Sequence, residues 1–355
     1  MCGTHHACLM RRVHKRERVM NVKSLMLASA ALACAGLPSF AETSEARIAL
    51  SNNYAGNSWR QAMLTSWETI TGPAVEAGIV AEASAFTTAE SQATEQAAQI
   101  QNMILEGYDA IVVNAASPTA LNGAVKEACD AGIIVVSFDG IVTEPCAWRI
   151  AVDFKEMGRG QVEYLAGVMP EGGNLLEIRG LAGVFVDDEI SAGIHAGVEQ
   201  FPQFTIVGSV HGDWAQDVAQ RAVAGILPSL PEIAGVVTQG GDGYGAAQAI
   251  AAAGRDTPVI VMGNRQDELL WWSEQKAASG YETMSVSIAP GVSTLAFWVA
   301  QQILDGREVP QDLVVPFLTI SQDTLDASLA TTPEGGVANV EYSLEDAIAV
   351  IEAAM

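Results

Sequence analysis

From residue 47 onward, short apolar runs alternate with longer segments whose apolar residues recur at helical spacing. Apolar runs bounded by polar or glycine loops predict strands, and amphipathic segments predict helices. Strands are predicted at 48–50, 79–83, 110–113, 133–138, 149–152, 175–178, 206–210, 235–238, 259–262 and 284–287. Helices are predicted at 58–76, 88–105, 118–131, 157–168, 190–200, 217–227, 244–253, 267–278, 292–304 and 344–354.

The order of these elements predicts an α/β fold. Wholly apolar strands that alternate with helices are typical of parallel sheets covered on both faces. The chain has 355 residues, which corresponds to roughly two domains of about 150 residues each. Because this number of strands is large for one such sheet, we predict two Rossmann-like lobes with parallel sheets.

Residues 1–41 have the three-part pattern of a secretory signal peptide. Basic residues outnumber acidic ones six to one there, a small-apolar run spans 25–37, and Ser39-Phe40-Ala41 fits a cleavage site. A start of translation at Met20 would leave a compact basic region before the apolar run. The pattern predicts export through the inner membrane and removal of the leader.

The net charge narrows the possible partners. Without residues 1–41 the chain keeps 12 basic and 41 acidic residues, a net charge of about −29. A nucleic-acid binder needs a basic surface, so that class is excluded. Strong self-repulsion favours a monomer. No apolar run beyond the leader reaches the roughly 18 residues that a membrane span needs.

Cysteine and histidine usage argues against metal and haem cofactors, and the sequence predicts no cofactor. Three of the five cysteines lie in the leader, which leaves Cys129 and Cys146. In an oxidising compartment these two can form a disulfide, and two free buried thiols are the alternative. The only histidines beyond the leader are His195 and His211, and no Cys-x-x-Cys occurs. Zinc and haem sites therefore have too few ligands.

Polar residues gather where the predicted strands end. In parallel sheets, ligands bind beyond the carboxyl ends of the strands. These ends are rich in amides, carboxylates and indole and poor in nucleophiles, which suits the binding of a polyhydroxylated molecule. An enzyme is disfavoured, because no base and nucleophile are positioned together and residues 240–245 contain no dinucleotide-binding Gly-x-Gly-x-x-Gly. The strand-end groups are 51–53, Asn114, 139–140, Asp153, 179–180, 211–214, 239–242 and 263–265.

The motifs, in their order along the chain, resemble the ribose-type periplasmic sugar-binding proteins, the soluble receptors of ATP-driven sugar importers. Gly56-Asn57-Ser58-Trp59-Arg60 stands where that family has Asn-Asn-Pro-aromatic-aromatic. Residues 131–139 match its Gly-Ile-Pro-Val-x-x-x-Asp, and residues 179–183 resemble its fifth-strand loop. The resemblance covers residues 46–320 and implies the type I periplasmic binding fold and no enzymatic activity.

The resemblance implies a ligand site between the lobes. Two indoles would sandwich the sugar ring, amides would bond its hydroxyls, and one carboxylate would take a pair of hydroxyls. Seven positions match or stand near family positions: Asn53, Asn57, Trp59, Asp139, Trp214, Gln239 and Asn264. Arg60 and Arg265 stand where the family has other residues, and they complete the candidate set of nine.

Two departures change the expected ligand. The family's arginine after the cleft aspartate is Gly140 here, and residues 187–189, all acidic, occupy the loop of a second expected arginine. We therefore expect a monosaccharide or sugar alcohol other than simple ribose. Arg60 and Arg265 leave a sugar acid as the alternative.

The resemblance also implies a three-segment hinge and a membrane partner. We place the crossings near 152–153, 287–289 and 318–321. The expected lobes are residues 42–152 plus 289–320 and residues 153–288 plus 321–355. The closed form would dock on the permease of an ABC importer in the inner membrane, so the protein is expected in the periplasm. A sensory receptor that presents its ligand to a membrane chemoreceptor or kinase is the alternative. The segment 322–355 is longer than the family's usual ending.

Overall fold

The computed structural model describes residues 43–89 and 92–355. The predicted signal peptide, residues 1–41, therefore lies outside the described residues. Within the described ranges, no helix combines the length and the apolar character that a bilayer crossing would need.

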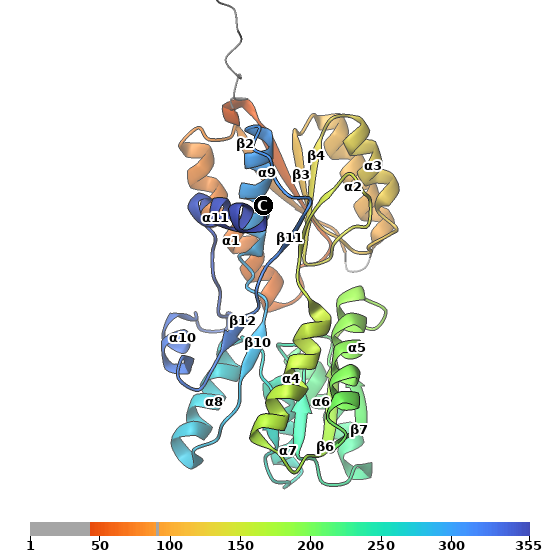
Figure 1. Ribbon diagram of the computed structural model, residues 1–355, viewed down its shortest axis with the longest axis vertical. Coiled ribbons are helices and arrows are strands. Elements are labelled where there is room, and N and C mark those ends of the chain that lie inside the picture. The colour runs from red at the N-terminus through yellow and green to blue at the C-terminus, as the bar shows by residue number, and fades with distance from the viewer. Residues whose placement is uncertain (1–42, 90–91) are drawn as a thin grey trace, which may run out of the picture. The chain divides into compact units, whose positions relative to one another are not determined.

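The first lobe is built on a six-stranded sheet in the order β11-β5-β4-β3-β1-β2, and every neighbouring pair is parallel (Figure 1). Its strands are β1 (Arg47–Asn52), β2 (Glu82–Thr87), β3 (Ala110–Asn114), β4 (Ile134–Phe138), β5 (Trp148–Ala151) and β11 (Asp312–Val314). Its helices are α1 (Ser58–Glu76), α2 (Ala93–Glu106), α3 (Asn122–Asp130), α9 (Val292–Leu304) and α11 (Leu344–Ala354).

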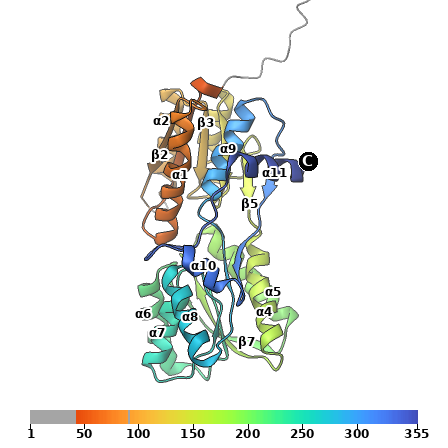
Figure 2. The same cartoon turned by 90° about the vertical axis from the view of Figure 1, so that its left-hand side faces the viewer.

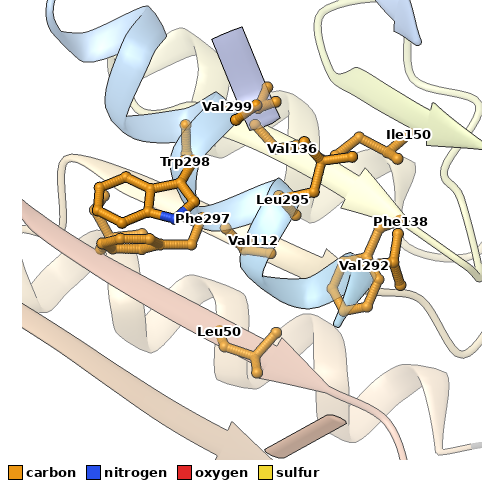
Figure 3. Close-up of a cluster of buried hydrophobic side chains, with 14 of the residues drawn as sticks. Leu50, Val112, Val136, Phe138, Ile150, Val292, Leu295, Phe297, Trp298 and Val299 are labelled. Atoms are coloured by element: carbon orange, nitrogen blue, oxygen red, sulfur yellow. The ribbon is translucent and has the colours of Figure 1, made fainter. Parts of the chain in front are cut away.

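Both faces of this sheet are covered, because successive strand residues point to opposite sides. Leu50, Val112 and Val136 pack with α1 and α9 on one face, while Ile111 and Val113 pack with α2 and α3 on the other. Figure 3 shows how α9 inserts its apolar side chains among the strand residues of the first face. This helix is buried on nearly all sides, because α1 and α11 also cover it.

The second lobe is built on four parallel strands in the order β7-β6-β8-β9. Its strands are β6 (Gly173–Arg179), β7 (Phe204–His211), β8 (Gly235–Val237) and β9 (Val259–Ile260). Its helices are α4 (Phe154–Val168), α5 (Phe185–Gln200), α6 (Gln216–Ile226), α7 (Gly243–Ala252) and α8 (Gln266–Ser279). Beside β9, a parallel bridge between Met262 and Ser285 leads to the antiparallel pair β10 (Ser285–Ser287) and β12 (Leu318–Ile320).

The predicted α/β architecture with two parallel sheets is confirmed, and α1, α9 and α11 have their predicted bounds. Several predicted elements are shifted: α2 begins at Ala93 instead of residue 88, α3 at Asn122 instead of 118 and α5 at Phe185 instead of 190. Strand β2 spans Glu82–Thr87 instead of 79–83. The apolar run before β2 includes Val80, which is buried in the core beside α1, so the edge strand itself is more polar than predicted. The three-residue strands β11 and β12 and the short helix α10 (Leu325–Thr331) were not predicted.

The C-terminal segment corrects the expected division into lobes. Residues 321–355 were assigned to the second lobe, but α11 packs against α9 and β11 of the first lobe, as both views show (Figures 1 and 2). Ala347 and Ile351 are fully buried in the first-lobe core, which is the physical reason. Of the two C-terminal helices, only α10 lies on the second lobe, against α8. The crossing that follows β11 lies at residues 315–317, just ahead of the expected 318–321, because β12 pairs with β10.

A disulfide joins Cys129 of α3 to Cys146 in the loop before β5, with a Cα–Cα distance of 6.4 Å. The closed loop contains β4 and the residues that follow it. The disulfide therefore joins the two ends of the segment that contains β4 and Asp139.

Candidate functional site

Loops from both lobes enclose one cavity of about 110 Å³. All nine residues of the candidate set line it. Those of the first lobe lie after β1, at the start of α1 and after β4, and those of the second lobe lie after β7, β8 and β9. The cavity thus lies beyond the carboxyl ends of both parallel sheets, as this kind of fold predicts.

A buried ion pair forms the first-lobe end of the cavity. Arg60 Nη2 lies 3.0 Å from Asp139 Oδ2, and the two side chains are 14% and 7% exposed. Asn114 donates from Nδ2 to the same oxygen at 3.0 Å, and Arg60 donates from Nη1 to Asn52 Oδ1 at 3.2 Å. Burial lowers the pKa of Arg60, while the charge of Asp139 opposes that effect. The pair is fixed from both sides and neutralises itself within the cavity.

The start of α1 fixes two further candidates, Asn57 and Trp59. Asn57 is the helix N-cap, and its Oδ1 accepts from the Arg60 backbone N–H at 2.8 Å. The Trp59 indole donates from Nε1 to the Ile288 carbonyl at 2.8 Å, which ties the first lobe to the segment after β10. Asn53, just after β1, also lines the cavity. The N-cap of α1 therefore fixes Asn57 beside the cavity, and the bond to Ile288 fixes Trp59.

Trp214 lies in a strained turn at the second-lobe side of the cavity. Its φ is 53° and that of Asp213 is 55°, both in the left-handed region. Residues other than glycine are held there only when the surrounding structure compensates, often at functional sites. A Cβ on Gly180 would lie 2.2 Å from the Trp214 ring, so only a glycine leaves room for this indole. His211 bonds through Nδ1 to the Gly180 carbonyl at 2.6 Å.

Gln239 lines the cavity, but most of its amide is already bonded to protein. Its Oε1 accepts from the Gly180 N–H at 3.0 Å, and its Nε2 donates to the backbone and side-chain oxygens of Asp187 at 3.0 and 2.9 Å. Asp187 also pairs with Arg179 at 2.6 Å and is fully buried. Asp187, in the first turn of α5, thus holds Gln239 in place.

Asn264 and Arg265 belong to a segment that contacts the C-terminal part of the chain. Asn264 donates from Nδ2 to the Ala338 carbonyl at 2.7 Å, and its backbone carbonyl accepts from the Ala338 N–H at 2.7 Å. Arg265 Nε lies 3.3 Å from Asp267 Oδ1. Glu268 Oε2 accepts from the Arg265 N–H at 3.2 Å, which anchors the start of α8.

Two buried acids lie behind the glycines that line the second-lobe floor. Asp242 is fully buried, and neither of its side-chain oxygens has a hydrogen-bond partner among the described residues. Burial raises its pKa well above the usual range, and the nearby Glu268 adds to the effect. Burial also raises the pKa of Glu268, although Oε1 accepts from the N–H groups of Gly243 and Gly263 at 2.9 and 3.2 Å. A pair of acids without a positioned substrate-facing base gives no catalytic arrangement.

Sequence reasoning missed the apolar side of the cavity. Five apolar side chains of the second lobe line it, from the start of α4 and from the start of α5 and the loop before it. Pattern analysis assigns such residues to the core, and three of them are core residues with at most 5% exposure. These lining residues are Phe154, Met157, Val184, Val186 and Ile190. Val337 of the C-terminal segment was also missed, because no motif marks it.

Comparison with known proteins agrees with this geometry. A family model described as a periplasmic binding protein domain matches residues 48–308. The chain is 25% identical over 250 residues to the xylitol-binding protein of Mycolicibacterium smegmatis, which covers 69% of this chain and 70% of that protein. It is 23% identical over 231 residues to the ribose import binding protein of Bacillus subtilis, covering 64% and 73% respectively.

A solved structure supports the same assignment. The ABC transporter solute binding protein from Thermobispora bispora DSM 43833 matches with a TM-score of 0.81 at 31% identity, covering 87% of this chain and 96% of that chain. The type I periplasmic binding fold expected from the motifs is thus confirmed. Because the family model matches more than half of the chain, this protein belongs to the periplasmic binding protein family, whose members are transport receptors of the periplasm and not enzymes.

Proposed function

We propose that this protein captures a neutral monosaccharide or sugar alcohol in the cavity between its lobes and delivers it unchanged to an ABC importer. One observation carries the proposal: all nine candidate residues, which lie far apart in the sequence, line the same cavity. Amides and a carboxylate can satisfy hydroxyl groups, and indole faces can cover the C–H faces of a sugar ring. The names of the xylitol-binding and ribose import relatives agree with a ligand of this class.

The charges in the cavity favour a neutral ligand. Arg60 is paired with Asp139 at 3.0 Å, and Arg265 lies 3.3 Å from Asp267. A paired cation gains less from an ionised ligand than a free one, because the ligand must compete with the existing carboxylate. Arg265 has the longer of the two ion-pair distances, so its guanidinium is the one that a carboxylate ligand could bind more easily. A sugar acid with Arg265 as its counter-ion is therefore the second candidate.

The apolar side of the cavity refines the ligand class. The side chains of Phe154 and Ile190 offer no hydrogen-bond donor or acceptor, and the thioether sulfur of Met157 is only a weak acceptor. A hydroxyl that loses water against them would not be compensated. The proposed ligand therefore presents C–H groups to the second-lobe wall and its hydroxyls to the ion pair and the amides.

Transport requires further steps that follow from the family. We propose that the leader in residues 1–41 directs export and is then removed. The closed, ligand-bound form would dock as a monomer on an inner-membrane permease, and the large negative charge beyond the leader opposes self-association. A sensory role would use the same cavity and would differ only in the membrane partner.

A ligand panel tests the proposal. The purified protein is titrated by calorimetry and thermal shift with D-ribose, D-xylose, xylitol, D-galactose, D-fucose and D-galacturonate. We expect binding of at least one neutral member at roughly micromolar affinity, about −8 kcal/mol. Binding of the sugar acid alone would favour the second candidate. If no member of the panel bound and a nucleotide did, the proposal would be refuted.

Matched indole variants locate the binding site. Trp214→Ala removes a cavity side chain, whereas Trp271→Ala removes an indole that packs on Tyr281 in the second lobe. We expect Trp214→Ala to weaken binding at least tenfold, about 1.4 kcal/mol, and Trp271→Ala to leave affinity unchanged. Equal effects of the two variants would remove Trp214 from the site.

A further inference from the structure

The C-terminal segment crosses between the lobes, in addition to the three expected crossings. After α10 on the second lobe, the chain runs along Asn264 and Arg265 and then reaches α9 and α11 of the first lobe (Figure 1). We call residues 336–342 the C-terminal strap. We propose that this strap is a fourth interlobe connection that positions Asn264 in the cavity and limits how far the lobes can separate.

The second-lobe anchor consists of backbone hydrogen bonds. The Gln266 N–H donates to the Gly336 carbonyl at 3.0 Å, and Arg265 and Val337 form an antiparallel bridge. The Ala338 N–H donates to the Asn264 carbonyl at 2.7 Å, and the Asn264 side chain donates back to the Ala338 carbonyl at 2.7 Å. The strap thus extends the second lobe like an added strand.

The strap also shapes the cavity. Val337 is 3% exposed and lines the cavity beside Asn264 and Arg265. The Nδ2 group of Asn264 is held by the strap, and no described residue donates to its Oδ1. The strap therefore fixes the orientation of the Asn264 amide, whose Oδ1 and second N–H remain available to a ligand. If the strap moved away, the cavity would lose a wall and Asn264 would lose its orientation.

The first-lobe anchor begins at the very next residue. Asn339 donates from Nδ2 to Ser66 Oγ of α1 at 2.8 Å and accepts at Oδ1 from the Gly291 N–H at 2.7 Å. A Cβ on Gly291 would lie 2.1 Å from the Val340 carbonyl oxygen, so the strap backbone passes in direct contact with the start of α9.

Farther along, α9 and α11 hold the end of the strap. The Tyr342 N–H donates to Thr294 Oγ1 at 2.9 Å, and the Trp298 indole donates to the Tyr342 carbonyl at 3.1 Å. Helix α11 then begins with a capping box between Ser343 and Asp346. This anchor is continuous with the buried core of the first lobe.

The two anchors leave no slack between them. Ala338 is bonded to the second lobe and Asn339 to the first, and consecutive Cα atoms are about 3.8 Å apart. By contrast, four residues separate β10 from α9, and three separate β11 from β12. Separation of the lobes at this point must therefore break one anchor or be converted into rotation about the φ and ψ bonds on either side of the Ala338–Asn339 peptide.

An insertion tests the constraint without removing either anchor. Four flexible residues, Gly-Gly-Ser-Gly, are inserted between Ala338 and Asn339. The matched control carries the same insertion after Gly335, an exposed turn residue on the second-lobe side of the strap. Spin labels attached to p-acetylphenylalanine leave the Cys129–Cys146 disulfide intact. The label pairs join exposed sites of the two lobes, 105 with 221 and 76 with 274.

Distances between the spin labels on the two lobes are measured by pulsed electron paramagnetic resonance on the full chain without ligand. We expect the Ala338/Asn339 insertion to lengthen or broaden at least one distance distribution, and the control insertion to match the parent protein. If the insertion variant does not fold, Asn339→Ala replaces it, because this change removes only the two side-chain bonds to the first lobe. Distributions that stay identical to the control in the folded variant would overturn the proposal.

The measurement separates this proposal from the proposed function. It uses no ligand, so a silent ligand panel would leave the strap result intact. Unchanged interlobe distances would reject the strap and leave the sugar-binding proposal standing.

Discussion

The ion pair between Arg60 and Asp139 makes a quantitative prediction about stability. Asp139→Ala removes the carboxylate that faces Arg60 Nη2 at 3.0 Å and leaves a guanidinium that is only 14% exposed. Breaking a buried ion pair from one side costs about 3–5 kcal/mol, because the remaining charge stays buried without its partner. At about 2–4 °C per kcal/mol, the melting temperature should fall by about 6–20 °C.

A double-mutant cycle checks the cause. Arg60→Met together with Asp139→Ala removes both charges, and replacement of a buried pair by apolar groups is often neutral. We therefore expect the double variant to be more stable than Asp139→Ala alone. The matched control is Asp312→Ala, which breaks the ion pair between Asp312 and Arg149. The Asp312 side chain is 62% exposed, so this change should lower the free energy of unfolding by at most about 1 kcal/mol. Calorimetric melting of the parent protein, Arg60→Met, Asp139→Ala and the double variant measures the cycle. Additivity within about 0.5 kcal/mol would refute the coupling of the two charges.

Other regions give predictions of the same kind. Gly180→Ala places a Cβ 2.2 Å from the Trp214 ring, so sugar affinity should fall at least tenfold with little change in melting temperature, and unchanged titrations would contradict the role of the indole. Replacing Cys129 and Cys146 by Ser removes a cross-link between residues 17 apart, and urea unfolding should show a loss of about 3 kcal/mol. Burial raises the pKa of Asp242, so the folded protein holds a proton that the unfolded chain releases, and stability falls as the pH rises above about 4. Asp242→Asn removes this dependence, so the stability of the variant relative to the parent should increase as the pH rises above about 4; a constant difference would exclude the buried acid as its source.

The pattern of the sequence was sufficient for the layered fold. Together with the family resemblance it found nine residues that line the cavity, but not the apolar side. Apolar strands such as β3 and β4 have sharply bounded runs, and each ends in a polar group that the parallel arrangement places at the same sheet edge. Asp139 could be found because it ends a predicted strand, whereas Asn57 and Trp59 were found through the family resemblance. Edge strand β2 was misplaced, because its polar residues weaken the apolar signal.

The roles of several residues depended on contacts that no local pattern encodes. Gln239 and Asn264 looked like two equivalent amides, yet one is bonded mainly to Asp187 and the other to Ala338. Phe154 and Ile190 read as core residues in the sequence, and only the meeting of two lobes makes them a cavity wall.

What the sequence determined by itself is therefore the order of strands and helices, the parallel sheets and the identity of the groups at the strand ends. Only the tertiary structure decided that residues 344–354 return to the first lobe and that the strap bonds to Asn264 through Ala338. The reason is physical: periodicity reports which face of an element is buried, but not which partner buries it. Partners such as Asn339 and Ser66, which lie 273 positions apart in the sequence, are chosen by packing over the whole chain.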